Sequence, residues 1–341
     1  RGHGAEHRAA CAQDAGGRPA LALPRVAAAI SARSLLALEL RLEQVLIDGA
    51  ELDVRRDPLG RIVVAGLDLG AAGSDDGAAA DWFFRQREFV VRGGTLRWTD
   101  ELRLAPTLAL RDVQLVVRNG LRQHSFRLDA TPDEAWGDRF VVQGRFTQPL
   151  LARAGDWRRW SGNTFVDLPR VDVHELRRHV TLPFEINEGD GALRAWIEVA
   201  DGQLRSGTAD IALRAVALRL SPKVEPLVFE QVEGRFVAQR SADGVNIALQ
   251  RFGFLTGDGV RWPQGDLSLA WRQRDGGPVS GGEFKAERLD LDVMAQIATR
   301  VPLGDALRQL LAELNPRGSV SGLASGAAVV LWGTRDARVT A

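Results

Sequence analysis

The chain has 341 residues, of which 45% are hydrophobic and 26% are charged, a composition typical of a folded protein with a sizeable buried core. Its 44 basic and 44 acidic residues cancel, so no net charge attracts nucleic acid, and none is expected as a partner. The single cysteine, Cys11, excludes an intrachain disulfide, and no uninterrupted run of about 18 apolar residues predicts a membrane-spanning helix. Because the sequence lacks an initiator methionine, we expect a segment of a longer protein.

The chain is predicted to begin with a disordered or poorly ordered segment, residues 1–20, which lacks periodic apolar residues. Further along, the dominant pattern is an alternation of apolar and polar residues, which is typical of half-buried β-strands. The Pro-Gly turn in "RRDPLG" (55–60) separates two such runs and predicts a β-hairpin. The alternating apolar residues around this turn are Ile47, Leu52, Val54, Ile62 and Val64.

Small residues dominate the next stretch, residues 66–80, which is predicted to be a linker or loop. The segment "ADWFFRQREF" (80–89) follows it. We predict that this segment contains a short helix laid against the sheet.

The strand predicted at residues 108–117 skips one position of its alternation. Asp112 stands where the next apolar residue is due, and the same slip recurs at Ala215 in the stretch 211–220. An extra residue of this kind is typical of a β-bulge, which bends a strand and restores its facing afterwards. The residues predicted to share one face are Leu108, Leu110, Val113, Leu115 and Val117 in the first stretch, and Ile211, Leu213, Val216, Leu218 and Leu220 in the second.

Two further pairs of segments resemble each other. The motif "VQGRF" (142–146) is similar to "VEGRF" (232–236), and residues 47–54 share their apolar and glycine spacing with residues 91–98. The offsets between copies differ, so the pattern predicts a β-meander that reuses one strand-turn-strand unit rather than an array of fixed period. The last copy adds Val91, Leu96 and Trp98 to the alternating apolar residues.

Helices are predicted in only two other places. The stretch "DVHELRRHV" (172–180) predicts one helix, and residues 291–318 predict two helices that are broken at Pro302. The second of these has an amphipathic face that we expect to pack on the sheet, with binding of a partner as the alternative. Its apolar stripe consists of Leu303, Leu307, Leu310, Leu311 and Leu314.

The histidines and acidic residues do not form a recognisable metal or catalytic motif. His174 and His179 have the wrong spacing for two ligands on one helix face. Asp290 and Asp292 offer two carboxylates, but no partner that could act as a general acid can be named. We therefore expect no metal, no cofactor and no enzymatic activity.

Two glycine-containing motifs are also incomplete. The segment "LTGDGVRW" (255–262) lacks the third glycine of a phosphate-binding loop and is better explained as a turn between strands. In "GSVSG" (318–322), Val320 occupies the position where a nucleophile elbow requires serine.

The segment "DWRRWSG" (156–162) combines two tryptophans with two arginines. Such a cluster can stack on nucleic-acid bases or lie at a lipid headgroup interface. With zero net charge, we favour a loop whose tryptophans anchor it to the sheet while an arginine covers a ring face.

A long meander must place its apolar face against something. A second sheet would give a sandwich, whereas an open, curved sheet leaves the face for an apolar ligand. The matched slips favour curvature, so we predict a mostly β fold: an elongated, curved antiparallel sheet that forms an open groove, with a few short peripheral helices. The candidate groove-lining residues are the alternating apolar residues named above.

Residues 20–67, 80–128, 161–180 and 301–318 resemble, in this order, segments of the YhdP family of AsmA-like envelope proteins. The resemblance covers residues 17–320. It implies a β-groove domain over residues 21–320, followed at 321–341 by the truncated beginning of the next strand region.

The resemblance implies a taco-shaped groove that crosses the periplasm. It also implies an N-terminal helix that anchors this groove in the inner membrane of a Gram-negative bacterium. It implies a role in phospholipid transport toward the outer membrane. The anchor helix has no counterpart in this sequence, so we expect the segment proximal to the inner membrane. The expected partners are phospholipid acyl chains, the membrane that the anchor would reach, and envelope proteins. The alternative is a rigid β scaffold for envelope assembly, with a closed core and no lipid.

Overall fold

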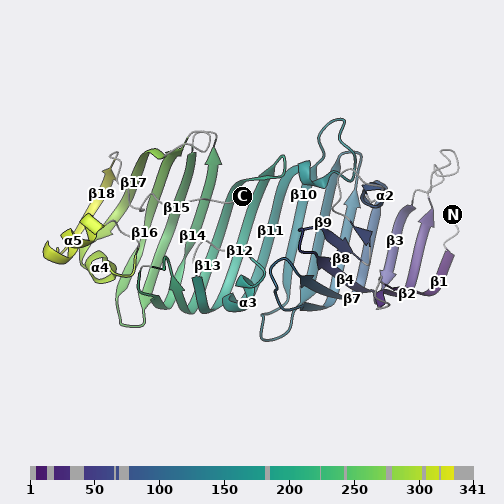
Figure 1. Cartoon of the computed structure of the whole chain (residues 1–341), viewed down its shortest axis with the longest axis horizontal. Coiled ribbons are helices and arrows are strands. Elements are labelled where there is room, and N and C mark those ends of the chain that lie inside the picture. The colour runs from purple at the N-terminus through teal and green to yellow at the C-terminus, as the bar shows by residue number, and fades with distance from the viewer. Residues whose placement is uncertain are drawn as a thin grey trace. The chain divides into compact units, whose positions relative to one another are not determined.

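The computed structural model describes residues 5–13, 19–30, 42–64, 67–68, 77–180, 185–222, 224–241, 244–273, 279–301, 305–314 and 316–325. Within these residues the chain is mostly β, with an open, curved sheet and few short helices, which confirms the predicted fold class (Figure 1). The chain divides into two compact units, one made of residues 1–169 and 196–204 and the other of residues 170–195 and 205–341.

The first unit is a sheet of neighbouring strands with one helix. Its elements are β1 (Ala5–Gln13), β2 (Pro19–Ile30), β3 (Leu42–Asp48), β4 (Glu51–Arg56), β5 (Ile62–Val64), β6 (Leu67–Asp68), α2 (Gly77–Arg85), β7 (Glu88–Asp100), β8 (Leu108–Asn119), β9 (Gln123–Thr131), β10 (Phe140–Thr147), the 3-10 turn Trp157–Arg159 and most of β11 (Ser161–Asp172). Strand β2 pairs with β1, β3 and β4, and strands β7 to β11 follow as antiparallel neighbours.

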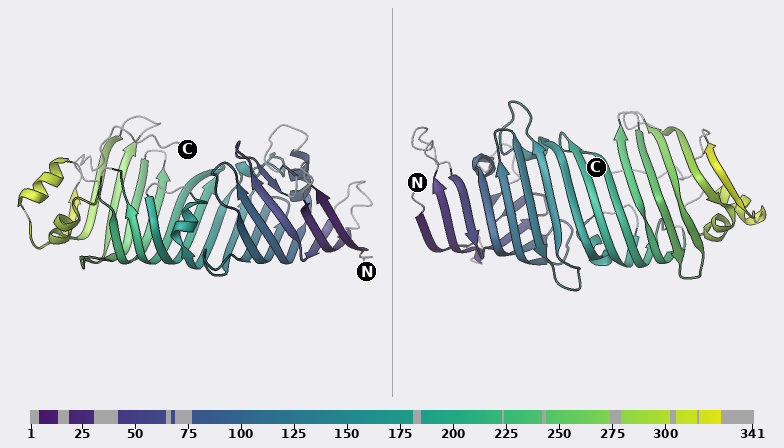
Figure 2. Two further views of the ribbon diagram at one scale, coloured as in Figure 1. Left: turned by 60° about the horizontal axis from the view of Figure 1, so that its bottom comes forward. Right: turned by 180° about the vertical axis from the view of Figure 1, so that it is seen from behind.

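The second unit contains an antiparallel meander and three short helices. Its elements are α3 (Val173–Arg177), most of β12 (Glu185–Ala200) and β13 (Gln203–Arg219), β14 (Leu227–Ser241), β15 (Gly244–Thr256), β16 (Arg261–Gln273), β17 (Val279–Asp290), α4 (Leu291–Ile297), α5 (Asp305–Leu314) and β18 (Ser319–Ser325). Strands β13 to β18 pair in chain order. Helix α4 lies against β17 and β18, as Figure 2 shows.

The similar segments 47–54 and 91–98 lie side by side. Strands β3 and β4 both pair with β7 in parallel, so that Ile47 is opposite Val91 and Leu52 is opposite Leu96. The two copies also bend at equivalent glycines, because Gly49 and Gly93 have φ values of 68° and 59°. The sequence predicts an antiparallel meander throughout, and this parallel pairing is an exception to it.

The predicted hairpin around "RRDPLG" is confirmed. Strand β4 pairs antiparallel with β5, with Val54 opposite Val64. The turn closes through a hydrogen bond from the Gly60 N–H to the Asp57 carbonyl (2.9 Å), and the φ of Gly60 is 78°, a value that favours glycine.

The slip at Asp112 is a β-bulge, as predicted. Asp112 has a φ of 49°, and between Arg111 and Gln114 the pairing of β8 with β9 shifts by one residue. Leu110 and Val113, on either side of the bulge, are both buried, at 4% and 1% exposure. The extra residue therefore returns the strand to the same facing.

Further residues in the second unit share this left-handed backbone. Ala215, the predicted twin, has a φ of 49°, and Arg251 in β15, which the sequence pattern did not indicate, has a φ of 47°. The pairing of β13 with β14 continues without a shift across Ala215, because β14 also has an extra residue at this level. That residue is Glu230, which has no counterpart in β15. Neighbouring strands thus bulge at the same level and stay aligned.

The predicted helices are present but shorter. Helix α3 covers only part of residues 172–180, and its first turn is capped by Asp172, whose side chain accepts a hydrogen bond from the Glu175 N–H. Helices α4 and α5 confirm the two helices predicted within 291–318, while the break at Pro302 lies outside the described residues. Of the leucine stripe, Leu311 is buried and Leu314 is 66% exposed, so Leu314 does not pack on the sheet. Leu303 lies outside the described residues, as do the side chains of Leu307 and Leu310.

Two strands near the ends of the chain do not follow the predicted boundaries. Strand β1 occupies residues 5–13, within the segment expected to be poorly ordered, because a ladder of main-chain hydrogen bonds with β2 needs no apolar periodicity. Strand β18 runs across the boundary predicted between residues 320 and 321.

The left-handed conformation of Asp112 predicts how the bulge responds to substitution. A β-branched side chain is strained at this φ, so Asp112→Val should lower the free energy of unfolding by about 1–2 kcal/mol, while Asp112→Gly should change it by less than about 1 kcal/mol. Denaturant unfolding of the purified chain measures both.

The control is Gln114→Val, at an exposed position of the same strand with an ordinary extended backbone, which should be close to neutral. Equal effects of Asp112→Val and Gln114→Val would contradict the strained bulge.

Candidate functional site

Apolar side chains line up across the strands of the first unit in one continuous row. Paired residues on neighbouring strands point to the same face of the sheet, so the strand pairing identifies the residues that form the row. The row consists of Val26, Ile47, Val91, Leu115, Leu128, Val142 and Val166, from β2 to β11. Only Val91 is buried, and the other members are partly exposed. The row is therefore an apolar surface that the described part of this unit covers only in part.

The second unit has a row of the same kind. It consists of Ala209, Phe236, Leu249, Leu267, Ala286 and Leu323, on the six strands from β13 to β18. Only Ala286 is buried. In both units the row runs across the strands, perpendicular to the chain direction.

Residues next to the rows along the strands are mostly polar. Arg127 and Asp129, which flank Leu128, form an ion pair of 2.8 Å. Asp210, next to Ala209, accepts two hydrogen bonds from the Arg235 guanidinium at 2.6 and 2.8 Å, and these bonds lower the pKa of Asp210. These ionic groups lie on the face opposite the rows, although in β3, β7 and β8 that face also carries the apolar residues Leu46, Val90 and Val116.

The candidate residues from the sequence fall on these faces. In the first unit, Leu52, Leu96 and Leu110 form a second set of paired residues beside the main row, and Val54, Trp98 and Leu108 form a third. Ile62 and Val64 extend the third set through β5. Whether the candidates contact a lipid stays a prediction.

Four of the seven residues of the first row and all six of the second were not among the residues predicted from the sequence. Among these are Leu128, Val142 and Val166 of the first row and Phe236 and Leu249 of the second. None of them lies in the stretches 108–117 and 211–220, whose alternation skips one position. The alternation in β9, β10, β14 and β15 is the signal that could have identified them.

Helix α2 covers part of the apolar face in the first unit and forms one wall of an open pocket of about 180 Å³. This confirms the predicted helix against the sheet. Phe83 stacks on Phe89 of β7 at 4.4 Å between ring centroids, and Phe84 meets Trp160 edge to face at 4.8 Å. The pocket is lined by Phe83, Phe84, Leu115, Val117, Asn119, His124, Ser125, Phe126, Phe146 and Trp160.

A buried polar network closes one side of this pocket. His124 stacks on the Trp160 ring at 3.9 Å, and its Nδ1 lies 2.9 Å from Asn119 Oδ1. Its Nε2 lies 3.3 Å from Gln148 Oε1, while the amide groups of Asn119 and Gln148 donate to main-chain carbonyls. Burial lowers the pKa of His124, and the hydrogen bond with Gln148 opposes that shift only in part.

Helix α2 is held in place by polar contacts from several elements. Asp81 accepts hydrogen bonds from Arg153 (2.6 and 2.9 Å) and from the Gly155 N–H (2.6 Å). Just beyond the helix, the side-chain oxygen of Gln86 accepts a hydrogen bond from the Leu42 N–H (2.7 Å). The main-chain carbonyl of Gln86 accepts one from the Asn119 side chain (2.9 Å). The helix is therefore a fixed part of this unit rather than a free arm.

The "DWRRWSG" segment is an anchored loop, which confirms the favoured interpretation. Trp160 is 5% exposed and packs on His124 and Phe84. The Arg158 guanidinium lies 5.4 Å from the centre of the Trp157 ring.

In the second unit, helices α3 and α4 contribute to a hydrophobic cluster on the sheet. The cluster contains Leu213 and Val216 of β13 together with Val293 and Ile297 of α4. Leu213 and Val216 are 6% and 1% exposed, so these two candidate residues pack in a core instead of lining an open surface. Ile211, Leu218 and Leu220 are partly buried against the same cluster.

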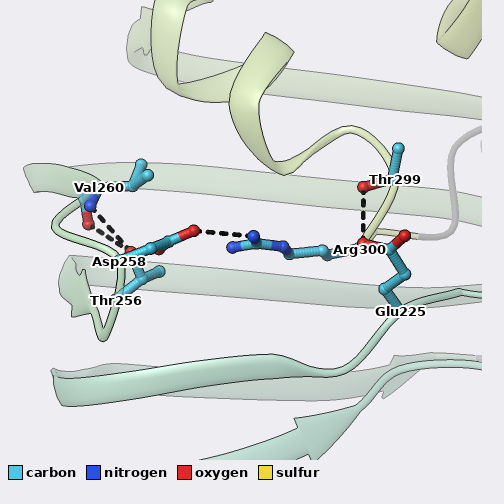
Figure 3. Close-up of polar contacts among 6 residues, drawn as sticks. All are labelled: Glu225, Thr256, Asp258, Val260, Thr299 and Arg300. Atoms are coloured by element: carbon cyan, nitrogen blue, oxygen red, sulfur yellow. Dashed lines mark hydrogen bonds and ion pairs between the residues drawn. The ribbon is translucent and has the colours of Figure 1, made fainter.

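A group of polar contacts fastens the end of α4 to two loops (Figure 3). Arg300 donates a hydrogen bond of 2.7 Å to Asp258, in the turn between β15 and β16. Thr299 contacts Glu225, before β14, at 3.3 Å. The hydrogen bond from Arg300, supported by one from Thr256, lowers the pKa of Asp258 to about 2. We call these contacts the α4 clamp.

The remaining candidate motifs have structural roles. The carboxylate of Asp290 caps α4 by accepting from the Val293 N–H (3.1 Å), and Asp292 accepts from the Gly318 N–H (2.8 Å). The segment 255–262 is a turn between β15 and β16, with a hydrogen bond of 3.0 Å from the Gly259 N–H to the Thr256 carbonyl. Among the described residues, no three His, Cys, Asp or Glu side chains are grouped for metal binding. His174 Nδ1 instead contacts the Asn187 carbonyl at 2.8 Å.

These features define a β protein with an open sheet, whose apolar face is only partly covered by short helices. The model of the YhdP protein family matches residues 11–326, and the chain belongs to this family. Neither a curated protein nor a solved structure shows significant similarity to the chain. In the part of the chain that the structure describes, no helix is both long and apolar enough to cross a membrane.

The α4 clamp makes a prediction about stability and pH. Arg300→Ala should lower the urea midpoint at neutral pH and speed amide exchange in α4, because the helix loses its attachment to Asp258. The stabilisation is fully present above the ordinary pKa of 3.8 and is lost as the pH falls through about 2. The difference in midpoint between the wild type and the variant should therefore be much smaller near pH 2 than at neutral pH.

Arg288→Ala, at an exposed position on β17, is the matched control and should leave exchange in α4 unchanged. A midpoint difference that persists undiminished near pH 2 would show that Arg300 acts through something other than the Asp258 carboxylate.

Proposed function

We propose that this chain shields phospholipid acyl chains on its apolar rows, as a segment of a periplasmic, inner-membrane-anchored protein that supports phospholipid transport between the inner and outer membranes. The observation that carries the proposal is the row from Val26 to Val166, in which seven neighbouring strands each contribute one apolar side chain. Membership in the YhdP family, which the resemblance above associates with this role, supports it.

The energetics of lipid transfer favour a surface of this kind. Moving an acyl chain through water exposes its methylene groups at about 0.8 kcal/mol each, so one chain of ordinary length faces a barrier on the order of 10 kcal/mol. A continuous apolar surface offsets this cost at every point along its length. No proton transfer, nucleophile or metal is required, and we propose that the chain is not an enzyme.

The direction of the rows suits a chain that slides. Neighbouring strands lie about 4.8 Å apart, so seven strands extend for roughly 29 Å. Since two leaflets share a hydrocarbon core of about 30 Å, one acyl chain is about 15 Å long and would span three or four strands. Each step to the next strand exchanges one apolar contact for an equivalent one.

The proposal also predicts weak selectivity for the lipid headgroup. The rows contain only apolar residues, and two pairs of ionic groups next to them along the strands, Arg235 with Asp210 and Arg127 with Asp129, are bonded to each other. A headgroup would remain in solvent at the open side of the sheet.

A second candidate is a rigid scaffold for the assembly of envelope proteins, with a closed core and no lipid. The cluster of Leu213 and Val216 with α4 favours this function for that part of the second unit. The partly exposed rows favour lipid shielding for the rest.

Site-specific photo-crosslinking in cells tests the proposal. A photoreactive amino acid at Leu115 or Leu267, both row residues, should label phospholipid. The same amino acid at Gln114 or Asp266, the preceding residue in each strand, should not, because alternation points it to the other face. The readout is the mass of the crosslinked lipid.

Equal labelling at the paired positions would contradict the assignment of the faces. Labelling of envelope proteins instead of lipid at Leu115 and Leu267 would favour the scaffold.

A further inference from the structure

We propose that the pocket under α2 holds the terminal segment of one acyl chain and so gives the lipid a defined binding position on the sheet. This inference rests on the proposed function and adds to it a defined binding site for the methyl end of a chain. The surfaces that form the site are the Phe83 and Phe84 rings of α2, the β8 side chains Leu115 and Val117, and the Phe126 and Phe146 rings.

The chemistry of the lining selects a hydrocarbon. No charged side chain lines the pocket. The two strongly polar residues of the lining, Asn119 and His124, are bonded to each other, to Gln148 and to the Gln86 carbonyl. Their polar atoms therefore face partners inside the protein rather than the pocket, and a polar ligand would lose its hydration while gaining few partners.

The volume of the pocket fits part of a lipid, not a whole one. An apolar cavity of about 150 Å³ stays dry and binds benzene, so a pocket of about 180 Å³ accommodates a short length of hydrocarbon. Phospholipid headgroups and whole acyl chains are too large. The end of one chain is the part of the molecule that matches both the size and the apolar lining.

The pocket is continuous with the row. Leu115 belongs to both, and Val117, two residues further along β8, points to the same face. A chain lying along Leu115, Leu128 and Val142 can therefore place its end between the sheet and α2 without crossing a polar surface.

The pocket is preformed, because α2 is attached on two sides. The ion pair of Asp81 with Arg153 (2.6 Å) and the hydrogen bond from Asn119 to the Gln86 carbonyl (2.9 Å) hold the helix over the sheet. Little conformational entropy is lost when the site fills, which favours binding.

The experiment uses phosphatidylethanolamine that carries a diazirine either at the methyl end or near the middle of one acyl chain, incorporated in cells that produce the full-length protein. Mass spectrometry maps the labelled residues. The end-labelled lipid should mark Phe84, Phe126 and Phe146, and the mid-chain lipid should mark Leu128 and Val142.

Val117→Phe fills the pocket and should reduce labelling of these phenylalanines by the end-labelled lipid at least about tenfold. Val116→Phe, the same change on the opposite face, is the control and should leave it unchanged. Because added volume can destabilise a packed site, benzene serves as a second probe of the wild-type protein: it should compete with end-labelling but not with mid-chain labelling.

End-labelled lipid distributed evenly along the row, or pocket labelling that benzene and Val117→Phe both leave unchanged, would overturn the pocket assignment while the proposed function stands. Absence of label from both lipids would overturn the proposed function itself.

Discussion

The structure depends on one constraint: side chains alternate along a strand, so an extra residue in one strand shifts its apolar side chains against a neighbouring strand unless that neighbour has an extra residue as well. In this chain each of two bulged strands has one such neighbour, while the pairing of β8 with β9 shifts by one residue. Gly93 in β7 accompanies Asp112 in β8, and Val91 and Leu96 stay opposite Leu115 and Leu110 on either side of the bulges. Glu230 in β14 accompanies Ala215 in β13 in the same way. Bending and the alignment of apolar rows are thereby compatible.

The same rows determine what the helices can do. Where a helix lies on the apolar face it converts part of that face into a core, as α4 does over Leu213 and Val216, or forms the wall of an open pocket, as α2 does beside Leu115 and Val117. In each case polar contacts position the helix: Asp258 with Arg300 for α4, and Asp81 with Arg153 for α2. Between these covered places the rows stay partly exposed.

The sequence predicted the fold class, the hairpin at "RRDPLG" and the bulge at Asp112, because each depends on local spacing or on turn residues. It did not predict the parallel pairing of β3 and β4 with β7 or the rows themselves, since these depend on register between segments far apart in the chain. Arg251 was missed because nothing in an arginine indicates a left-handed backbone. The pocket required α2 to be placed over β8, β9 and β10, a tertiary arrangement that periodicity does not contain.

The central claim is that the exposed apolar rows are covered by lipid in the cell. Purification of the protein without detergent, followed by solvent extraction and quantitative lipid mass spectrometry, tests it most directly. We expect phospholipid in at least stoichiometric amounts with little preference for headgroup, and a large decrease when Leu115 and Leu128 are both replaced by glutamate in protein that remains folded. Protein that is folded, monodisperse and free of phospholipid would contradict it.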